Sequence, residues 1–249
     1  MNGQNSTRTG RIAPRDERQA MFVNPSPGAS AVIARRQPPL DTILNGNCID
    51  LMRNMASESI DFILTDPPYL ANYRSRDGRT IHNDVSSDWL RPAFYEAYRL
   101  LRRDRFCVSF YGWPHVDKFV AAWRAAGFHI VGHIVFQKKY SSSVRFLRYQ
   151  HEQAYLLAKG SPERPADPLP DVLPLPYTGN HLHPTQKAVS ALVPLVRTFS
   201  REGERVLDPF CGSAAALVAA KQLNRRYLGI ELDPDYHAIA TRRMQREAA

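Results

Sequence analysis

The stretch at residues 206–220, VLDPFCGSAAALVAA, has the pattern of a buried strand, a tight turn and a helix built from small residues. Apolar residues lead to Asp208, Gly212 stands in the turn, and the alanines that follow can pack closely against a sheet. In open α/β sheets, ligands bind beyond the carboxyl ends of the strands, where the backbone N–H groups of such a turn face them. The stretch therefore predicts an α/β fold and the place of its ligand site.

Apolar runs of strand length alternate with stretches of helical periodicity on both sides of this stretch. Strands are predicted at 42–44, 60–65, 105–111, 128–137, 152–159, 205–207 and 226–230, and helices at 50–56, 89–101, 116–126, 185–199, 212–223 and 234–246. We expect Asp233 to cap the last helix. Residues 160–176 hold six prolines and are predicted to be a loop or linker without a regular element. The alternation is typical of a Rossmann-like fold with a mostly parallel sheet and helices on both faces.

Composition limits the class of protein. The chain has 249 residues and a formal net charge of +9, which suits one α/β domain and an anionic partner such as nucleic acid. Residues 1–40 carry six arginines against two acids and predict a disordered basic tail, followed by a single domain at 41–249. No apolar run approaches the roughly 18 residues of a membrane span, and the first residues lack the apolar core of a signal peptide. We therefore expect no membrane partner and a cytoplasmic location.

The three cysteines Cys48, Cys107 and Cys211 are far apart in the sequence and form no CxxC pair. They predict small buried residues rather than a disulfide framework or a zinc site, and no metal is expected.

Glu231 ends the next predicted strand, 23 residues after Asp208, where an acid is placed to bind the two hydroxyls of a ribose. The glycine patterns of dinucleotide-binding and phosphate-binding loops are absent. Asp208 at the mouth of the turn would repel a pyrophosphate and attract an amino group. S-adenosylmethionine fits these residues because it joins adenosine to a sulfonium cation and an amino-acid end without phosphate.

The segment Asp66-Pro67-Pro68-Tyr69 directly follows the buried strand predicted at 60–65. The two prolines stiffen the loop, so that backbone carbonyls and the Asp66 carboxylate can act as fixed hydrogen-bond acceptors. Such acceptors suit methylation of an exocyclic amine on a base, because they can bond the amine hydrogens and free a delocalised lone pair. Tyr69 can stack on the base, which must be flipped out of a duplex to be reached.

Further motifs occur in a fixed order along the chain. They are Asn45-Gly46-Asn47-Cys48, SIDFILTDPPY at 59–69, His151-Glu152, HPTQK at 183–187, DPFCGSA at 208–214 and GIELD at 229–233. In this order they resemble the N4/N6 amino-methyltransferase family of bacterial DNA methyltransferases, in the permuted beta-class arrangement where the catalytic segment precedes the cofactor segment. The resemblance runs from about residue 42 to the end and implies the methyltransferase fold with S-adenosyl-L-methionine as cofactor.

The resemblance also implies roles for single residues. The catalytic residues would be Asp66, Pro67, Pro68 and Tyr69. The residues that bind the cofactor would be Asn47, Thr185, Lys187, Asp208, Phe210, Gly212, Ser213 and Glu231. Thr185 and Lys187 are expected near its methionine carboxylate.

Two positions depart from the family pattern. Ala214 stands where the family usually has Gly, and its methyl group could crowd the cofactor or be tolerated. Asn47 stands where Asp is usual, and its amide can still hydrogen-bond to adenine.

A basic segment with interleaved aromatic residues begins at residue 138. Its cations Lys138, Lys139, Arg145 and Arg148 are predicted to bind DNA phosphates, and the aromatic residues to contact a displaced base. Residues 138–182 stand where the family places target recognition, and the short length fits a compact recognition site or a helper subunit.

The leading hypothesis is a DNA adenine N6-methyltransferase that acts on double-stranded DNA, since Asp in the first position of DPPY favours adenine. The alternatives are an N4-cytosine DNA methyltransferase, an RNA or protein-amine methyltransferase, and a DNA-binding regulator with weak or lost catalysis. A homodimer and a restriction or specificity partner are compatible with the family resemblance.

Overall fold

The computed structural model describes residues 35–71, 86–144, 146–179, 182 and 186–246. Within them a single sheet contains eight strands: β1 (Thr42–Asn45), β2 (Phe62–Thr65), β3 (Arg105–Phe110), β4 (His129–Gln137), β5 (His151–Lys159), β6 (Val172–Pro174), β7 (Arg205–Asp208) and β8 (Arg226–Glu231). The strand order is β1-β8-β7-β2-β3-β5-β4-β6. The first five strands in this order are parallel, β5 runs antiparallel to both β3 and β4, and β6 is parallel to β4. The predicted α/β fold with a mostly parallel sheet is confirmed.

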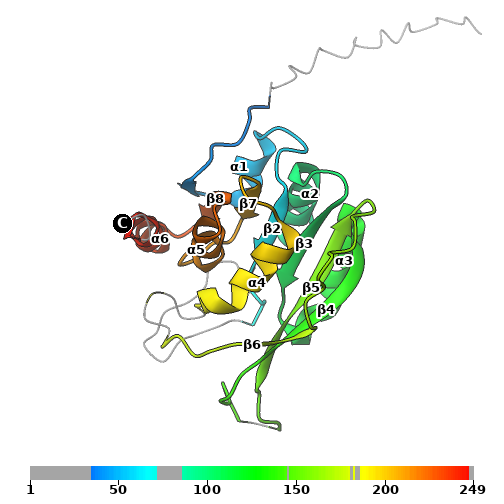
Figure 1. Cartoon of the computed structure of the whole chain (residues 1–249), viewed down its shortest axis with the longest axis vertical. Coiled ribbons are helices and arrows are strands. Elements are labelled where there is room, and N and C mark those ends of the chain that lie inside the picture. The colour runs from blue at the N-terminus through cyan, green and yellow to red at the C-terminus, as the bar shows by residue number, and fades with distance from the viewer. Residues whose placement is uncertain (1–34, 72–85, 145, 180–181, 183–185, 247–249) are drawn as a thin grey trace, which may run out of the picture. The chain divides into compact units, whose positions relative to one another are not determined.

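Helices cover both faces of the sheet (Figure 1). One face carries α1 (Cys48–Arg53), α2 (Leu90–Leu100), the short 3₁₀ turn Trp113–His115 and α3 (Val116–Ala126), and the other carries α4 (Val189–Phe199), α5 (Ala215–Gln222) and α6 (Pro234–Arg246). Strand β2 contributes to both cores, because Phe62 and Leu64 pack on the α4–α6 side and Ile63 packs on the other side. A strand buried on both faces explains the continuous apolar run of its sequence.

Several helices begin at other residues than predicted. Helix α5 begins at Ala215 rather than 212, because Gly212 and Ala214 have φ angles of 49° and 65°, which a right-handed helix cannot contain. Helix α4 begins at Val189, since Ala188 is extended. Helix α6 begins as predicted, and the Asp233 cap is confirmed: its Oδ1 accepts hydrogen bonds from the backbone N–H groups of Asp235 and Tyr236 at 2.8 and 3.1 Å.

The prediction that residues 160–176 lack regular structure is wrong for three residues. Strand β6 pairs with the outer edge of β4, in the register Val135 to Val172. The side chain of Leu173 is buried, and this burial of apolar surface stabilises the strand. Pro174 is tolerated because only one side of an edge strand has to donate to a neighbour.

The remaining expectations concern the start of the chain, the membrane and the cysteines. Residues 1–34 of the predicted tail lie outside the described residues, and Arg36 exchanges backbone hydrogen bonds with Asn54 and Ala56. No helix in the described part of the chain is long and apolar enough to cross a membrane. All three cysteines are free and buried, as predicted.

Candidate active site

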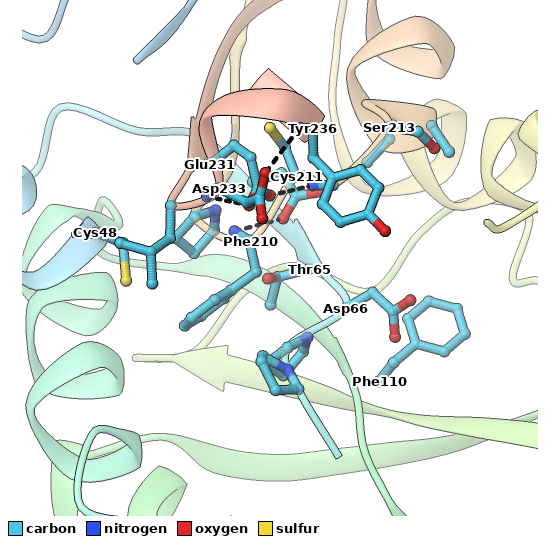
Figure 2. A pocket seen from close by; sticks show the side chains of 18 of the residues that line it. Cys48, Thr65, Asp66, Phe110, Phe210, Cys211, Ser213, Glu231, Asp233 and Tyr236 are labelled. Carbon is cyan, nitrogen blue, oxygen red and sulfur yellow. Dashed lines mark hydrogen bonds between the residues drawn. The ribbon is translucent and has the colours of Figure 1, made fainter. Parts of the chain in front are cut away.

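A cavity lies at the carboxyl ends of the parallel strands, where the fold class places ligand sites. Figure 2 shows part of its lining, with Asp66 and Phe110 in one region and Glu231, Asp233 and Tyr236 in another. The cavity brings together most of the predicted site: Asn47, Asp66, Pro67, Pro68, Tyr69, Lys187, Asp208, Phe210, Gly212, Ser213 and Glu231 all line it. Thr185 lies outside the described residues.

Backbone groups hold the first acid of the cavity, Glu231, at the end of β8. Its Oε2 accepts a hydrogen bond from the N–H of Gly212 at 2.8 Å, and its Oε1 accepts one from Asp233 at 2.9 Å (Figure 2). Burial nevertheless raises the pKa of the Glu231 carboxyl above its ordinary value. The carboxylate is therefore fixed in direction and partly desolvated, as a ligand for hydroxyl groups would need to be.

Asp208, at the end of β7, is 4% exposed and accepts a hydrogen bond from the N–H of Phe210 at 3.1 Å. Burial raises the pKa of its carboxyl to about 8, although the Phe210 N–H acts in the opposite direction. Among the described residues, no cation forms an ion pair with Asp208 or Glu231. Two such acids beside the turn disfavour a phosphate and favour a ligand that brings an ammonium group and a ribose.

Asp66 begins the Asp-Pro-Pro-Tyr loop directly after β2, and side chains occupy both of its oxygens. The Tyr69 hydroxyl donates to Oδ1 at 2.7 Å, and the Lys187 ammonium donates to Oδ2 at 2.5 Å. Lys187 is 6% exposed, and its Nζ lies 4.8 Å from the centre of the Phe110 ring. The expectation that Lys187 lies near a methionine carboxylate stays a prediction; in this structure its ammonium pairs with Asp66, and the residue lines the cavity.

A second carboxylate shares this lysine. Glu152 of β5 lies with its Oε2 at 2.9 Å from Lys187 and its Oε1 at 2.5 Å from Lys138. Burial acts to raise the pKa of Glu152, but the two ammonium groups prevail and lower it to about 2. The sequence signal for Glu152 was its place in the His151-Glu152 motif, which carried no role by itself.

A glycine that sequence reasoning did not single out supports the Asp-Pro-Pro-Tyr loop. A Cβ atom on Gly112, just after β3, would lie 2.5 Å from the Tyr69 carbonyl oxygen and 2.8 Å from its Cβ. Real Cβ atoms do not approach backbone so closely, so Gly112 allows the loop to pack against the end of β3. Its position after an apolar strand was visible in the sequence, but its neighbour was not.

The two departures from the family pattern have local explanations. Ala214 is fully buried and packs in the core on the α4–α6 side, and it is not among the residues that line the cavity. Its φ of 65° lies in the left-handed region, where Gly is favoured, so Ala at this position strains the backbone conformation. Asn47 caps α1, since its Oδ1 accepts a hydrogen bond from the Ile49 N–H at 2.9 Å.

The basic segment forms the end of the β4–β5 hairpin and divides into two parts. Lys138 is 6% exposed and paired with Glu152, whereas Lys139 and Arg148 are exposed. Between these two cations, Val144, Phe146 and Leu147 are 68%, 99% and 69% exposed. Arg145 lies outside the described residues. The end of the hairpin therefore presents a surface of exposed apolar and basic side chains, and Lys138 is not part of this surface.

A sheet of this order, with an acid-lined cavity and an Asp-Pro-Pro-Tyr loop at the ends of its parallel strands, is the architecture of an amino-methyltransferase. The sequence matches the N6/N4 family described as "DNA methylase" over residues 60–171 and 168–242, and the chain belongs to this family. A protein of Escherichia coli (strain K12) named "Putative methylase YubD" is 50% identical over 205 residues, which cover 82% of this chain and 90% of that protein.

Solved structures share the fold. A "Putative DNA Modification Methylase" of Thermus thermophilus, solved in complex with S-adenosyl-L-methionine, is 24% identical and matches with a TM-score of 0.65 over 83% of this chain and 93% of its own. PvuII DNA methyltransferase, which is cytosine-N4-specific, is 16% identical and matches with a TM-score of 0.67 over 85% of this chain and 91% of its own. The family resemblance and the methyltransferase fold predicted from the sequence are therefore confirmed.

Proposed function

We propose that the protein methylates the exocyclic N6 amine of adenine in double-stranded DNA, with S-adenosyl-L-methionine as the methyl donor. One observation carries this proposal: the Asp66 loop and the two acids Asp208 and Glu231 open into the same cavity. A base held by Asp66 and a cofactor held by Asp208 and Glu231 would meet there.

The residues of the turn fit this cofactor. S-adenosyl-L-methionine supplies an electrophilic methyl group on a sulfonium centre. Glu231 would accept hydrogen bonds from its ribose hydroxyls, and Asp208 would pair with its amino group. Asn47, Phe210, Gly212 and Ser213 complete the proposed contacts, and the part of Thr185 in them remains a prediction.

The catalytic loop would hold and activate the amine. The Asp66 carboxylate and the Pro67 carbonyl accept its two hydrogens, which draws the nitrogen towards tetrahedral geometry and frees its lone pair. Pro67 and Pro68 have fixed φ angles, so these acceptors need little reorganisation. Tyr69 lies beside them to stack on the base. The alkylated nitrogen then loses one proton, for which the Asp66 carboxylate is the acceptor.

The hairpin end is the proposed DNA contact. Lys139 and Arg148 would bind phosphates, and the exposed apolar residues around Phe146 would fill the space left when the base turns out of the duplex. Arg145 is expected to add to this charge, and residues 138–182 to take part in target recognition. A homodimer and a restriction or specificity partner remain predictions.

The choice of adenine rests on Asp66 as the first residue of the loop. The fold is compatible with either base, since the cytosine-N4-specific PvuII enzyme shares it. The deciding experiment transfers labelled methyl groups from S-adenosylmethionine to mixed-sequence duplex DNA and analyses the product nucleosides. N6-methyladenine is the expected product; N4-methylcytosine would overturn the base assignment.

The same assay tests the catalytic residue. Asp66→Ala should retain cofactor binding and lose methyl transfer by at least about 100-fold, the usual effect of removing a main electrostatic partner. Normal methylation by this variant would refute the role of Asp66. Absence of both methyl transfer and cofactor binding in the wild type would favour a DNA-binding regulator on the same fold.

A further inference from the structure

Each oxygen of Asp66 already accepts a hydrogen bond from a side chain in this structure. Tyr69 donates to Oδ1, and Lys187 donates to Oδ2. If Asp66 accepts a hydrogen from the base amine, as the proposed function requires, the amine has to compete with these two donors for the lone pairs of the carboxylate, and the charged ammonium is the stronger competitor. Lys187 is the partner with an alternative, because its ammonium already lies 2.9 Å from Glu152.

We propose that Glu152 is a positioning residue that acts through Lys187: it takes over the lysine ammonium when Asp66 turns from Lys187 to the amine of the base. The arrangement seen in the free protein is then a resting state in which Lys187 covers Asp66. This inference rests on the proposed function and adds to it the residue that makes the exchange possible.

The geometry around Glu152 supports this role. Its Oε1 is held by Lys138 at 2.5 Å, which leaves Oε2 for Lys187. Lys138 directly follows β4 and its backbone N–H bonds to Gln150 at 2.8 Å, so the antiparallel β4–β5 pair fixes the carboxylate in place. The acceptor that receives the ammonium is therefore preorganised before the base arrives.

The balance of charge explains why a second acid is needed. Asp66, Glu152, Lys138 and Lys187 together carry two negative and two positive charges in a largely buried cluster. Without Glu152, an ammonium that left Asp66 would be buried without a counter-ion, which is strongly unfavourable. Lys187 would then stay on Asp66 and compete with the substrate.

The first test is Glu152→Gln, which keeps the shape and removes the charge. We expect the kcat of methyl transfer to fall at least tenfold, while cofactor affinity stays within twofold because Glu152 is not among the residues that line the cavity with Asp208 and Glu231. Glu96→Gln is the matched control: Glu96 is also buried and ion-paired, with Arg99 at 2.7 Å, but lies on α2 away from the cavity lining. A loss of kcat no larger than that of the control would overturn the proposal.

A double variant tests whether Glu152 acts through Lys187. In a Lys187→Gln background there is no ammonium to transfer, so adding Glu152→Gln should change kcat less than twofold. Multiplication of the two single effects would show that Glu152 acts independently and would refute the mechanism.

The pH profile supplies a readout that a purely structural role would not produce in this form. The charged and titratable groups around Asp66 are Tyr69, Lys187 and Glu152, with Lys138, Tyr140 and Asp208 near them. Burial raises the pKa of Asp66, Lys187 lowers it and Glu152 adds to the rise. The acidic limb of kcat/KM should therefore move to lower pH in Glu152→Gln and to higher pH in Lys187→Gln; movement in the same direction would contradict the proposal.

The outcome separates this inference from the proposed function. If wild-type protein methylates DNA, Asp66→Ala does not, and Glu152→Gln behaves as the control, the function stands and the role of Glu152 is wrong. If wild-type protein methylates no DNA, the function fails and the role of Glu152 fails with it.

Discussion

The two halves of the cavity hold their acids by different means. Glu231 accepts hydrogen bonds from the backbone N–H groups of Gly212 and Asp233, which are 19 and 2 residues away in sequence. Asp66 instead depends on the side chain of Lys187, 121 residues away. The proposed cofactor half is thus built from one strand–turn–helix and the strand beside it, whereas the proposed catalytic half is assembled from distant loops and strands.

This difference predicts that the two halves can be disturbed separately. Backbone donors carry no net charge and cannot leave their acceptor without unfolding the turn. Side-chain cations can exchange partners, which suits a carboxylate that has to release one ligand and bind another. Substitutions near Tyr69 should therefore change catalysis, and substitutions near Asp208 should change cofactor binding.

The largest effect is expected from Gly112→Ala. The new Cβ would meet the Tyr69 backbone at 2.5 Å, so the catalytic loop has to shift while the cofactor turn stays in place. We expect kcat to fall about 100-fold, the usual effect of a displacement near 1 Å, and cofactor affinity to stay within twofold. Steady-state kinetics and direct binding of S-adenosylmethionine measure the two quantities.

Gly132→Ala is the control for this variant. Gly132 lies within β4, has no left-handed φ, and an added Cβ would meet only the Leu156 side chain, at 3.3 Å. Its kcat should stay near that of the wild type. Equal losses of kcat and cofactor affinity in Gly112→Ala would show that the two halves are not separable.

The same division explains how much the sequence could predict. Asp208, Glu231 and the Asp233 cap belong to local patterns of strand, turn and helix, and their positions in the fold followed from those patterns. Lys138 and Lys139 are adjacent and chemically alike, yet one is buried against Glu152 and the other is exposed. Composition gave both lysines the same role, because only the pairing of β4 with β5 determines which of them is buried against Glu152.

Long-range contacts were equally invisible for the residues around Asp66. The spacing of residues 66, 152 and 187 contains no signal that their charges meet, since three separate elements have to be packed first. The clash that makes Gly112 necessary also depends on the packed loop. Contacts between residues close in sequence could therefore be predicted, whereas most contacts between residues distant in sequence could not.

The next prediction concerns pH in the cofactor half. Because burial raises the pKa of Asp208 to about 8, this group is mainly protonated in the free protein at pH 6–7. A ligand ammonium needs the carboxylate, so binding releases a proton, and affinity should rise about tenfold from pH 6 to pH 7. Above about pH 8 the affinity should fall again, as the ligand α-amino group loses its proton.

Calorimetry in buffers of different ionisation enthalpy measures both the affinity and the released proton. Asp208→Asn should bind more weakly and without this rise. The free energy of unfolding should change with pH in the opposite direction to the affinity. Because the pKa of Asp208 is raised in the folded state, ionisation of this group destabilises the free protein as pH increases from about 4 to 8. A pH-independent affinity in the wild type would show that Asp208 does not meet a cation.

The smallest effect is expected from Ala214→Gly, which restores the residue usual in the family. Glycine relieves a left-handed conformation that costs alanine roughly 1 kcal/mol, but it removes a buried methyl worth about 0.8 kcal/mol and loosens the unfolded chain. These terms nearly cancel, so the free energy of unfolding should change by less than about 1 kcal/mol. Gly203→Ala is the reciprocal control: with a φ of 75° and no atom within 4 Å of the new Cβ, it carries the left-handed cost and the opposing unfolded-chain effect without a packing contribution, and should destabilise by less than about 1 kcal/mol. Because the Ala214 methyl packs in the core, cofactor affinity should change less than threefold in Ala214→Gly; a gain of tenfold would mean that the methyl limits the cofactor site after all.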